Sequence, residues 1–169
     1  RAPYGRRPLA QVGAFSEPIT RHLLGRGAEL VVVACNTASA VSLNHLRATF
    51  PGVTFVGMEP AIKPAAAASQ TQTIGVLATA VTFQGELFAS LRDRYAEGIT
   101  IIEQVCDGWV EQVETGLVTG PEVMDLVRRH LDPVLAAGAD TLVLGCTHYP
   151  FLIDSIRAVT GNAIEIIDP

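Results

Sequence analysis

The sequence has little charge, a single lysine and no long apolar run. Charged residues make up 17% of its 169 residues and hydrophobic ones 49%, which is the opposite of a disordered composition. The net charge of −5, with Lys63 as the only lysine, disfavours binding to nucleic acid through its phosphates. No apolar run approaches the ~18 residues of a membrane-spanning helix, and the first residues do not resemble a signal peptide. We therefore expect a globular protein that needs neither nucleic acid nor membrane.

Cysteine is also scarce, and its three copies are far apart. Cys35, Cys106 and Cys146 form no CxxC pair, so neither a disulfide framework nor a structural zinc site is expected. The phosphate-binding patterns GxGxxG and GxxxxGK[ST] are absent as well. The simplest interpretation is three free thiols in a reducing, cytoplasmic compartment.

Short apolar runs alternate with longer helical stretches along the whole chain. Because the apolar runs are continuous, they are typical of parallel strands that are buried on both faces. The alternation predicts an α/β fold with mostly parallel sheets flanked by helices. The expected strands are 30–35, 53–58, 73–77, 99–105, 141–146 and 163–167, and the expected helices are 8–26 (kinked or split at Pro18), 38–49, 60–70, 80–96, 120–137 and 150–160.

Two segments of the sequence echo each other. VVVACNT at 31–37 and LVLGCTH at 142–148 each place a cysteine at the end of a predicted strand. In both halves the next strand ends in an acid followed by proline, at Glu59 and Asp168, and nearly the same length of chain separates the cysteine from that acid. The repeat predicts two pseudo-symmetric lobes.

The repeat also predicts the bounds of the lobes and a deficit in the first. We expect a first lobe at 1–60 and a second at 61–169. The second half begins its first strand at Thr73, far ahead of Cys146, whereas Cys35 lies close to the start of the sequence. About one strand–helix unit is therefore expected to be missing from the front of the first lobe.

Both repeated cysteines fall where a parallel sheet forms its ligand crevice. The carboxyl ends of the strands and the N-termini of the following helices line that crevice, and a helix N-terminus favours the thiolate form of cysteine. Asn36 and Thr37 after the first cysteine, and Thr147 and His148 after the second, offer donors for an anion such as a carboxylate. Two opposed thiols suit a racemase, because one can remove a proton from a stereocentre while the other delivers one to the opposite face. His148 is placed to tune or reprotonate the thiol of Cys146.

Three segments carry a resemblance to a known family: Pro3–Tyr4–Gly5, VVVACNTASA at 31–40 and LVLGCTHYP at 142–150. They resemble the cofactor-independent glutamate racemases of the aspartate/glutamate racemase superfamily. The likeness extends through VGMEPAIKPA, IGVLAT and CDGWVEQVETG. It implies interconversion of L- and D-glutamate without pyridoxal phosphate, metal or other cofactor. It also implies that the D-glutamate feeds peptidoglycan synthesis, and so cell wall biogenesis and cell shape.

The resemblance assigns roles to individual residues. It implies that Cys35 and Cys146 are the opposed acid/base catalysts, that His148 assists the second and that Glu114 assists the first. It implies substrate binding by Pro3, Tyr4, Gly5, Asn36, Thr37 and Thr147. The family's opening strand with an Asp-Ser-Gly motif, and its closing helices, are not matched here. The resemblance thus agrees with the repeat in predicting a chain truncated at both ends.

Other functions stay open on the residues alone. Within the superfamily these are an aspartate racemase, a hydantoin racemase and a one-cysteine decarboxylase. A thiol redox or metal-binding module would use Cys35, Cys146 and His148. A fragment that binds a carboxylate without catalysis would follow from the missing unit. The expected partner is a small-molecule substrate, and the sequence leaves open whether the chain forms a homodimer.

The remaining cysteine, tryptophan and histidines are expected to be structural. Cys106 and Trp109 are predicted to pack, and the helical stretches place His22, His45 and His130 at the surface or in hydrogen bonds.

Overall fold

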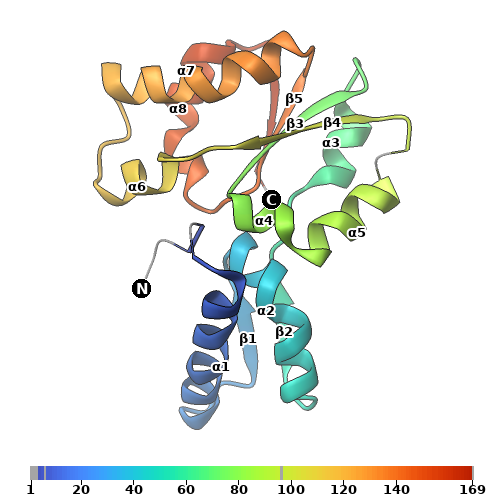
Figure 1. Ribbon diagram of the computed structural model, residues 1–169, viewed down its shortest axis with the longest axis vertical. Helices are drawn as coiled ribbons and strands as arrows, with labels where there is room; N and C mark the ends of the chain where they lie inside the picture. Colours follow the sequence, from blue (N-terminus) through green and yellow to red (C-terminus); the bar gives the residue numbers. More distant parts are fainter. Residues whose placement is uncertain (1–3, 6, 96, 169) are drawn as a thin grey trace.

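The computed structural model describes residues 4, 5, 7–95 and 97–168 and arranges them in two lobes (Figure 1). The smaller lobe holds a two-stranded sheet, β1-β2, and the larger one a four-stranded sheet in the order β4-β3-β5-β6. Every strand pair is parallel, which confirms the predicted α/β class. The elements are α1 (Leu9–Gly25), β1 (Leu30–Val33), α2 (Asn36–Thr49), β2 (Thr54–Gly57), α3 (Ile62–Ala68), β3 (Thr73–Ala78), α4 (Ala80–Gln84), α5 (Glu86–Tyr95), β4 (Thr100–Val105), α6 (Trp109–Glu114), α7 (Pro121–Ala136), β5 (Thr141–Leu144), the 3-10 helix η1 (Tyr149–Leu152), α8 (Ile153–Thr160) and β6 (Glu165–Ile167).

The sheet of the larger lobe is covered on both faces. Residues from α6, α7, α8 and η1 form a core on one face, and residues from α3 and α5 form a second core on the other. Successive side chains of a strand point to opposite faces, so a covered sheet buries whole strands. All four residues of β5 are buried, and so are all residues of β3 after Thr73. Burial on both faces, predicted from the continuous apolar runs, is confirmed for these two strands.

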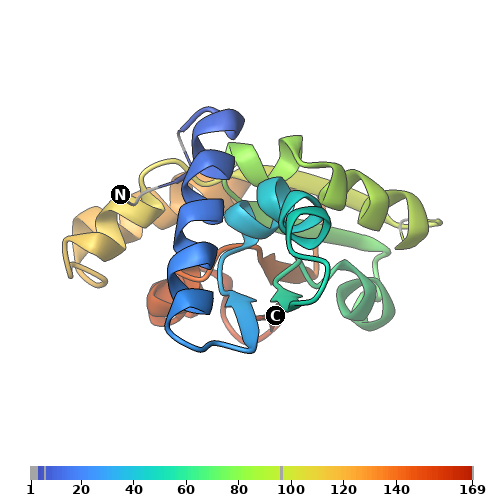
Figure 2. The same ribbon diagram turned by 90° about the horizontal axis from the view of Figure 1, so that it is seen from below.

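The sheet of the smaller lobe is covered on one face only. Val31 and Phe55 pack against α2 residues in a small core, and α1 lies beside α2 in both views (Figures 1 and 2). The opposite face carries Leu30, Val32 and Val56, which are 49%, 56% and 46% exposed. The prediction of burial on both faces is therefore wrong for β1 and β2, because nothing in the described part of the chain covers this second face.

The internal repeat is present in the structure. Leu30 of β1 stands opposite Thr54 of β2, and Thr141 of β5 stands opposite Glu165 of β6, so the two parallel pairs have the same offset along the chain. Cys35 and Cys146 follow β1 and β5 at the same short distance in sequence. The two cysteines therefore occupy equivalent places in two related parallel pairs. The division at residues 60 and 61 stays a prediction.

The two lobes meet along α2, α4 and α5. Thr37 of α2, Thr79 and Thr82 of α4 meet here, and their three buried hydroxyl groups are within 2.9–3.2 Å of one another. Gly85, between α4 and α5, approaches α2 so closely that a Cβ there would lie 2.7 Å from the Cβ of Ala40. Small and hydroxylated side chains thus allow the lobes to pack tightly beside the predicted site.

Two local predictions need correction, and one helix was not predicted. The stretch 80–96, predicted as one helix, contains α4 and α5, which break at Gly85. Helix α1 continues through Pro18 without a split. The short helix α6 was not expected from the sequence, because it is too short to show a hydrophobic period.

Candidate active site

A pocket of about 200 Å³ lies where the two lobes meet. Its walls come from the carboxyl ends of β1, β3 and β5, the edge at which a parallel sheet binds ligands. Seven of the predicted site residues line it: Tyr4, Gly5, Cys35, Thr37, Cys146, Thr147 and His148. Asn36 and Glu114 lie just outside this lining, and Pro3 lies outside the described residues.

Cys35 caps the N-terminus of α2. Its backbone is extended, with φ −157° and ψ 123°, and its Sγ atom accepts a hydrogen bond from the Ala38 amide at 3.5 Å. The thiol is partly exposed and therefore accessible from the pocket. The predicted position of this cysteine, after a strand and before a helix, is confirmed.

Cys146 enters the pocket from the second lobe, at the end of a tight turn after β5. The turn runs close to β3, since the Gly145 amide donates to the Leu77 carbonyl at 2.7 Å. A Cβ at Gly145 would lie 2.9 Å from that same carbonyl oxygen, so only glycine allows this approach without a shift.

The thiol of Cys146 differs from the expectation of a stabilised thiolate. Burial raises the pKa of Cys146 to about 12, a backbone hydrogen bond at His148 opposes the rise, and Cys35 adds to it. The lowering expected from backbone amides that follow the strand is present only as the His148 hydrogen bond, and burial outweighs it; helix α8 begins only at Ile153. The resting thiol is consequently protonated and needs a base to ionise.

A base is present beside this thiol. The Nδ1 atom of His148 lies 3.8 Å from Cys146 Sγ, and its Nε2 atom lies 2.7 Å from Glu114 Oε1. An Nε2–H that donates to the carboxylate leaves Nδ1 free to accept the thiol proton. The three side chains therefore form a chain in which Glu114 orients His148 and His148 faces Cys146.

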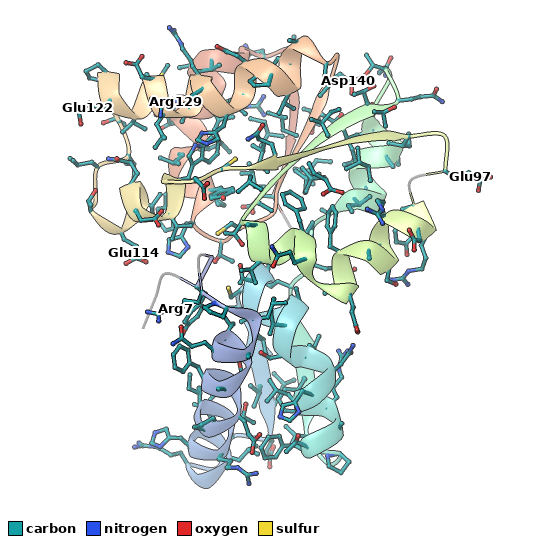
Figure 3. The ribbon with its side chains drawn as sticks, viewed as in Figure 1. Arg7, Glu97, Glu114, Glu122, Arg129 and Asp140 are labelled. Carbon is teal, nitrogen blue, oxygen red and sulfur yellow. The ribbon has the colours of Figure 1, made fainter. Side chains whose placement is uncertain are left out.

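Glu114 sits at the end of α6, on the side of the second lobe that faces the first (Figure 3). The resemblance implied that it assists Cys35. In the structure its carboxylate contacts His148, next to Cys146, and its role toward Cys35 stays a prediction. The side chains of His148 and Glu114 are 28% and 52% exposed, so the pair can exchange protons with water.

Asn36 is the most unusual polar group near the pocket. It is only 2% exposed, and neither Nδ2 nor Oδ1 has a hydrogen-bond partner among the described residues. Leaving a buried amide unpaired costs about 1–3 kcal/mol. A buried amide that is left unpaired at this cost is typical of a group that hydrogen-bonds to a ligand. Its neighbour Thr37 lines the pocket and is held by Thr79 and Thr82.

Three residues of the pocket wall were not predicted: Ala34, Thr79 and Val110. Thr79 directly follows β3, so the rule that selected the two cysteines, the carboxyl end of a parallel strand, could have found it. Val110 belongs to α6, a helix that no periodic pattern in the sequence predicted.

The third cysteine is not part of the pocket lining. Cys106 is 3% exposed and packs in the larger core, where burial raises its pKa well above the ordinary value. All three cysteines are free thiols.

Within the described residues, no group of three or more His, Cys, Asp or Glu side chains is arranged to hold a metal ion, which gives the metal-binding alternative no support. No helix in that part of the chain is long and apolar enough to cross a membrane.

Comparison with known proteins agrees with this geometry. Residues 9–169 match the Asp/Glu/Hydantoin racemase family. The chain is 49% identical over 168 residues to a glutamate racemase of Roseiflexus sp. (strain RS-1), covering 99% of this chain and 62% of that relative. It superposes with a TM-score of 0.87 and 35% identity on the Escherichia coli glutamate racemase solved with L-glutamate and the activator UDP-MurNAc-ala, covering 99% of this chain and 64% of that one. The Francisella tularensis glutamate racemase solved with D-glutamate gives a TM-score of 0.84 at 25% identity, covering 100% and 62%.

The chain thus spans about three fifths of the length of the relatives that it matches. The match to the family nevertheless includes both cysteine-bearing strand ends and every helix and strand of the fold. On this evidence the chain belongs to the Asp/Glu/Hydantoin racemase family.

Proposed function

We propose that this chain interconverts L- and D-glutamate by proton transfer between two cysteines. One observation carries the proposal: Cys35 and Cys146 come from different lobes, at equivalent strand ends, and line the same pocket. A racemase must remove a proton from one face of a stereocentre and return one to the other, and two thiols in this arrangement supply both groups.

The two directions use the same groups in reversed roles. In one direction His148 takes the Cys146 thiol proton, and the thiolate then accepts the α-proton of the amino acid. The electron pair of the broken C–H bond stays on the α-carbon and its carboxylate. The Cys35 thiol delivers its proton to the opposite face and becomes a thiolate. In the other direction Cys35 accepts the α-proton and Cys146 donates.

Donors around the pocket favour a substrate with a carboxylate. Asn36 offers an unpaired buried amide, and the Thr37 and Thr147 hydroxyls lie beside the two cysteines. Neutral donors of this kind bind carboxylate oxygens strongly when they are shielded from water. Glutamate is preferred over aspartate or a hydantoin because the relatives at 43–49% identity are named glutamate racemase. A supply of D-glutamate for peptidoglycan and a cytoplasmic location stay predictions.

Exchange of the α-proton in D₂O tests the proposal without requiring net turnover. Proton NMR should show loss of the α-proton signal from both L- and D-glutamate, and much slower loss from aspartate. Cys35→Ser and Cys146→Ser should each slow the exchange by at least about a hundredfold, the lower range for loss of a general acid or base. If neither substitution slows the exchange, the two-cysteine mechanism is wrong.

A second candidate is a domain that binds glutamate without catalysing its racemisation. The observation in its favour is that the chain spans only 62% of the Roseiflexus relative. Titration calorimetry separates the two functions, because this candidate requires glutamate binding by a chain that shows no α-proton exchange. An Asn36→Leu variant, which removes the unpaired amide, should weaken binding under either proposal.

A further inference from the structure

We propose that Trp109 and His130 are positioning residues, which hold Glu114 on His148 and so keep the base in place beside Cys146. The inference rests on the proposed function, because it assigns a role in the Cys146 half of the reaction. Neither residue is part of the pocket lining.

Trp109 anchors the helix that carries Glu114. It is the first residue of α6 and Glu114 is the last. An isolated helix as short as this is not stable in water, so contacts outside the helix must fix its position. The indole is fully buried, and the next residue, Val110, lines the pocket. A movement of Trp109 would therefore move both Glu114 and one wall of the site.

The same indole also packs against the segment that carries His148. Tyr149 directly follows His148, and its ring meets the indole edge-to-face at a centroid distance of 4.9 Å and an angle of 68°. Tyr149 is fully buried, and its hydroxyl donates to the Cys106 carbonyl at 3.5 Å. Trp109 is consequently the shared contact of the two segments whose side chains form the Glu114–His148 pair.

His130 fixes the orientation of the indole. The Trp109 Nε1–H donates to His130 Nδ1 at 3.1 Å, and the two rings are perpendicular, at 89° and 5.9 Å. This bond requires an unprotonated Nδ1. Nδ1 also lies 2.9 Å from the Leu126 carbonyl, so a proton on Nδ1 would be donated there and the indole N–H would lose its acceptor. His130 thus links α6 to the long helix α7.

Replacing His130, the acceptor of the indole N–H, tests the link between α6 and α7 without changing the size of the side chain much. In His130→Leu the indole N–H has no acceptor, whereas His130→Gln keeps an acceptor oxygen of similar reach. Trp109→Phe keeps an aromatic ring but removes the donor. The first readout is the rate at which iodoacetamide alkylates Cys146, followed by peptide mass spectrometry, with Cys35 of the same chain as the internal reference. The second is α-proton exchange of glutamate.

His130→Leu and Trp109→Phe should each slow alkylation of Cys146 relative to Cys35 by about threefold or more, within the usual range for coupled neighbours. The reason is that an unanchored His148 accepts the thiol proton less often. His130→Gln should restore the wild-type ratio. In a Glu114→Gln background both substitutions should have a smaller effect, because the hold on Glu114 is already lost and only the packing of Trp109 against Tyr149 remains.

Two results would overturn the inference: equal changes at Cys146 and Cys35, which indicate general loosening, or the same effect with and without Glu114. Absence of glutamate exchange in the wild-type chain would overturn the proposed function instead. It would leave the alkylation result, and hence this inference about the Cys146 thiol, standing on its own.

Discussion

His148 Nε2 lies 2.7 Å from Glu114 Oε1, although the two residues are far apart in the sequence. The contact joins the end of α6 to the turn that follows Cys146. The contact decides which ring nitrogen of His148 can accept the thiol proton, because the nitrogen that donates to the carboxylate cannot also accept from sulfur. The asymmetry between the two cysteines follows from it: Cys146 has a base beside it, while Cys35 accepts an amide hydrogen bond at a helix N-terminus.

Replacing Glu114 by glutamine should slow glutamate racemisation by about tenfold to a hundredfold. An amide can present its NH₂ group to His148 and reverse the tautomer, which would aim an N–H at the thiol in place of a lone pair. The loss should be smaller than the roughly 10⁴-fold known for a buried orienting carboxylate, because Glu114 is 52% exposed. Circular dichroism of the amino acid measures the rate.

Glu97→Gln, at an exposed position on the far side of the second lobe (Figure 3), is the matched control. Equal rates for wild type and Glu114→Gln would remove Glu114 from the mechanism.

Alkylation of Cys146 should keep accelerating with pH where an ordinary thiol has levelled off. The pKa of Cys146 is raised to about 12 by burial, and iodoacetamide reacts with the thiolate. Between pH 8 and 10 the rate at this residue should therefore rise by about tenfold per pH unit. When the chain is unfolded by urea, the alkylation rate of Cys146 should level off near pH 9, the ordinary pKa of the thiol. A plateau at that pH in the folded chain would contradict the raised pKa.

The same shift has a consequence for stability. The unfolded chain releases the Cys146 proton near pH 9 and the folded chain near pH 12. The unfolded state therefore binds fewer protons in that interval, and the free energy of unfolding falls as pH rises through it. Cys106 and Tyr149, whose pKa values are also raised by burial, act in the same direction. Urea midpoints at pH 8 and 10 should show the fall, and Cys146→Ala should reduce its slope.

Asp140 should make the fold sensitive to acid. Partial burial raises the pKa of its carboxyl group, but hydrogen bonds from Ser69, Thr71 and Gln70 outweigh this and lower it to about 2. The Ser69 hydroxyl donates at 2.6 Å, and the Gln70 and Thr71 amides donate at 2.7 and 2.8 Å. The unfolded carboxyl protonates first as pH falls, so this contribution is complete above about pH 4 and is lost towards pH 2.

Asp140→Asn checks this contribution, since it removes the charge and keeps the size. The variant should be less stable than wild type at pH 7 and should lose less stability between pH 4 and 2, as measured by urea unfolding. Asp125→Asn, at an exposed position of α7, should leave the acid profile unchanged. Parallel profiles for Asp140→Asn and wild type would mean that the carboxylate does not hold the 69–71 loop.

The larger lobe could be predicted well from its sequence because its central strands are buried on both faces. After an initial threonine, the runs around Val76 and Val143 carry no polar side chain, and a run of this kind between helical stretches is typical of a central parallel strand. The smaller lobe shows the same pattern at Val31 and Val32. There only Val31 is covered, because coverage of the second face depends on elements that the described residues do not supply.

The site was predictable where it follows a strand end and not where it depends on tertiary approach. Cys35, Thr37, Cys146 and Thr147 could be located because a parallel sheet brings its carboxyl ends to one edge. The contact between His148 and Glu114 depends on where α6 lies, and α6 is capped by Gly108, with φ +87°, and held by Trp109. Burial of Cys146 likewise depends on the tertiary packing of the larger core, which no local pattern encodes.

Adding a methyl group at Gly85 should separate the lobes at the pocket. A Cβ there would lie 2.7 Å from the Cβ of Ala40 on α2, while the backbone at Gly85, with φ −76°, suits any residue. Steric overlap is therefore the dominant effect, since overpacking of this kind typically costs about 1–3 kcal/mol and the entropic gain of a Gly→Ala change is smaller. The displaced α2 would carry Thr37 away from Thr79 and Thr82, so Gly85→Ala should weaken glutamate binding as well as lower the urea midpoint. Gly52→Ala, with no atom within 4 Å of its Cβ, is the control and should be neutral or slightly stabilising. Loss of stability with unchanged glutamate affinity would show that the contact between Gly85 and Ala40 supports the fold without setting the geometry of the pocket.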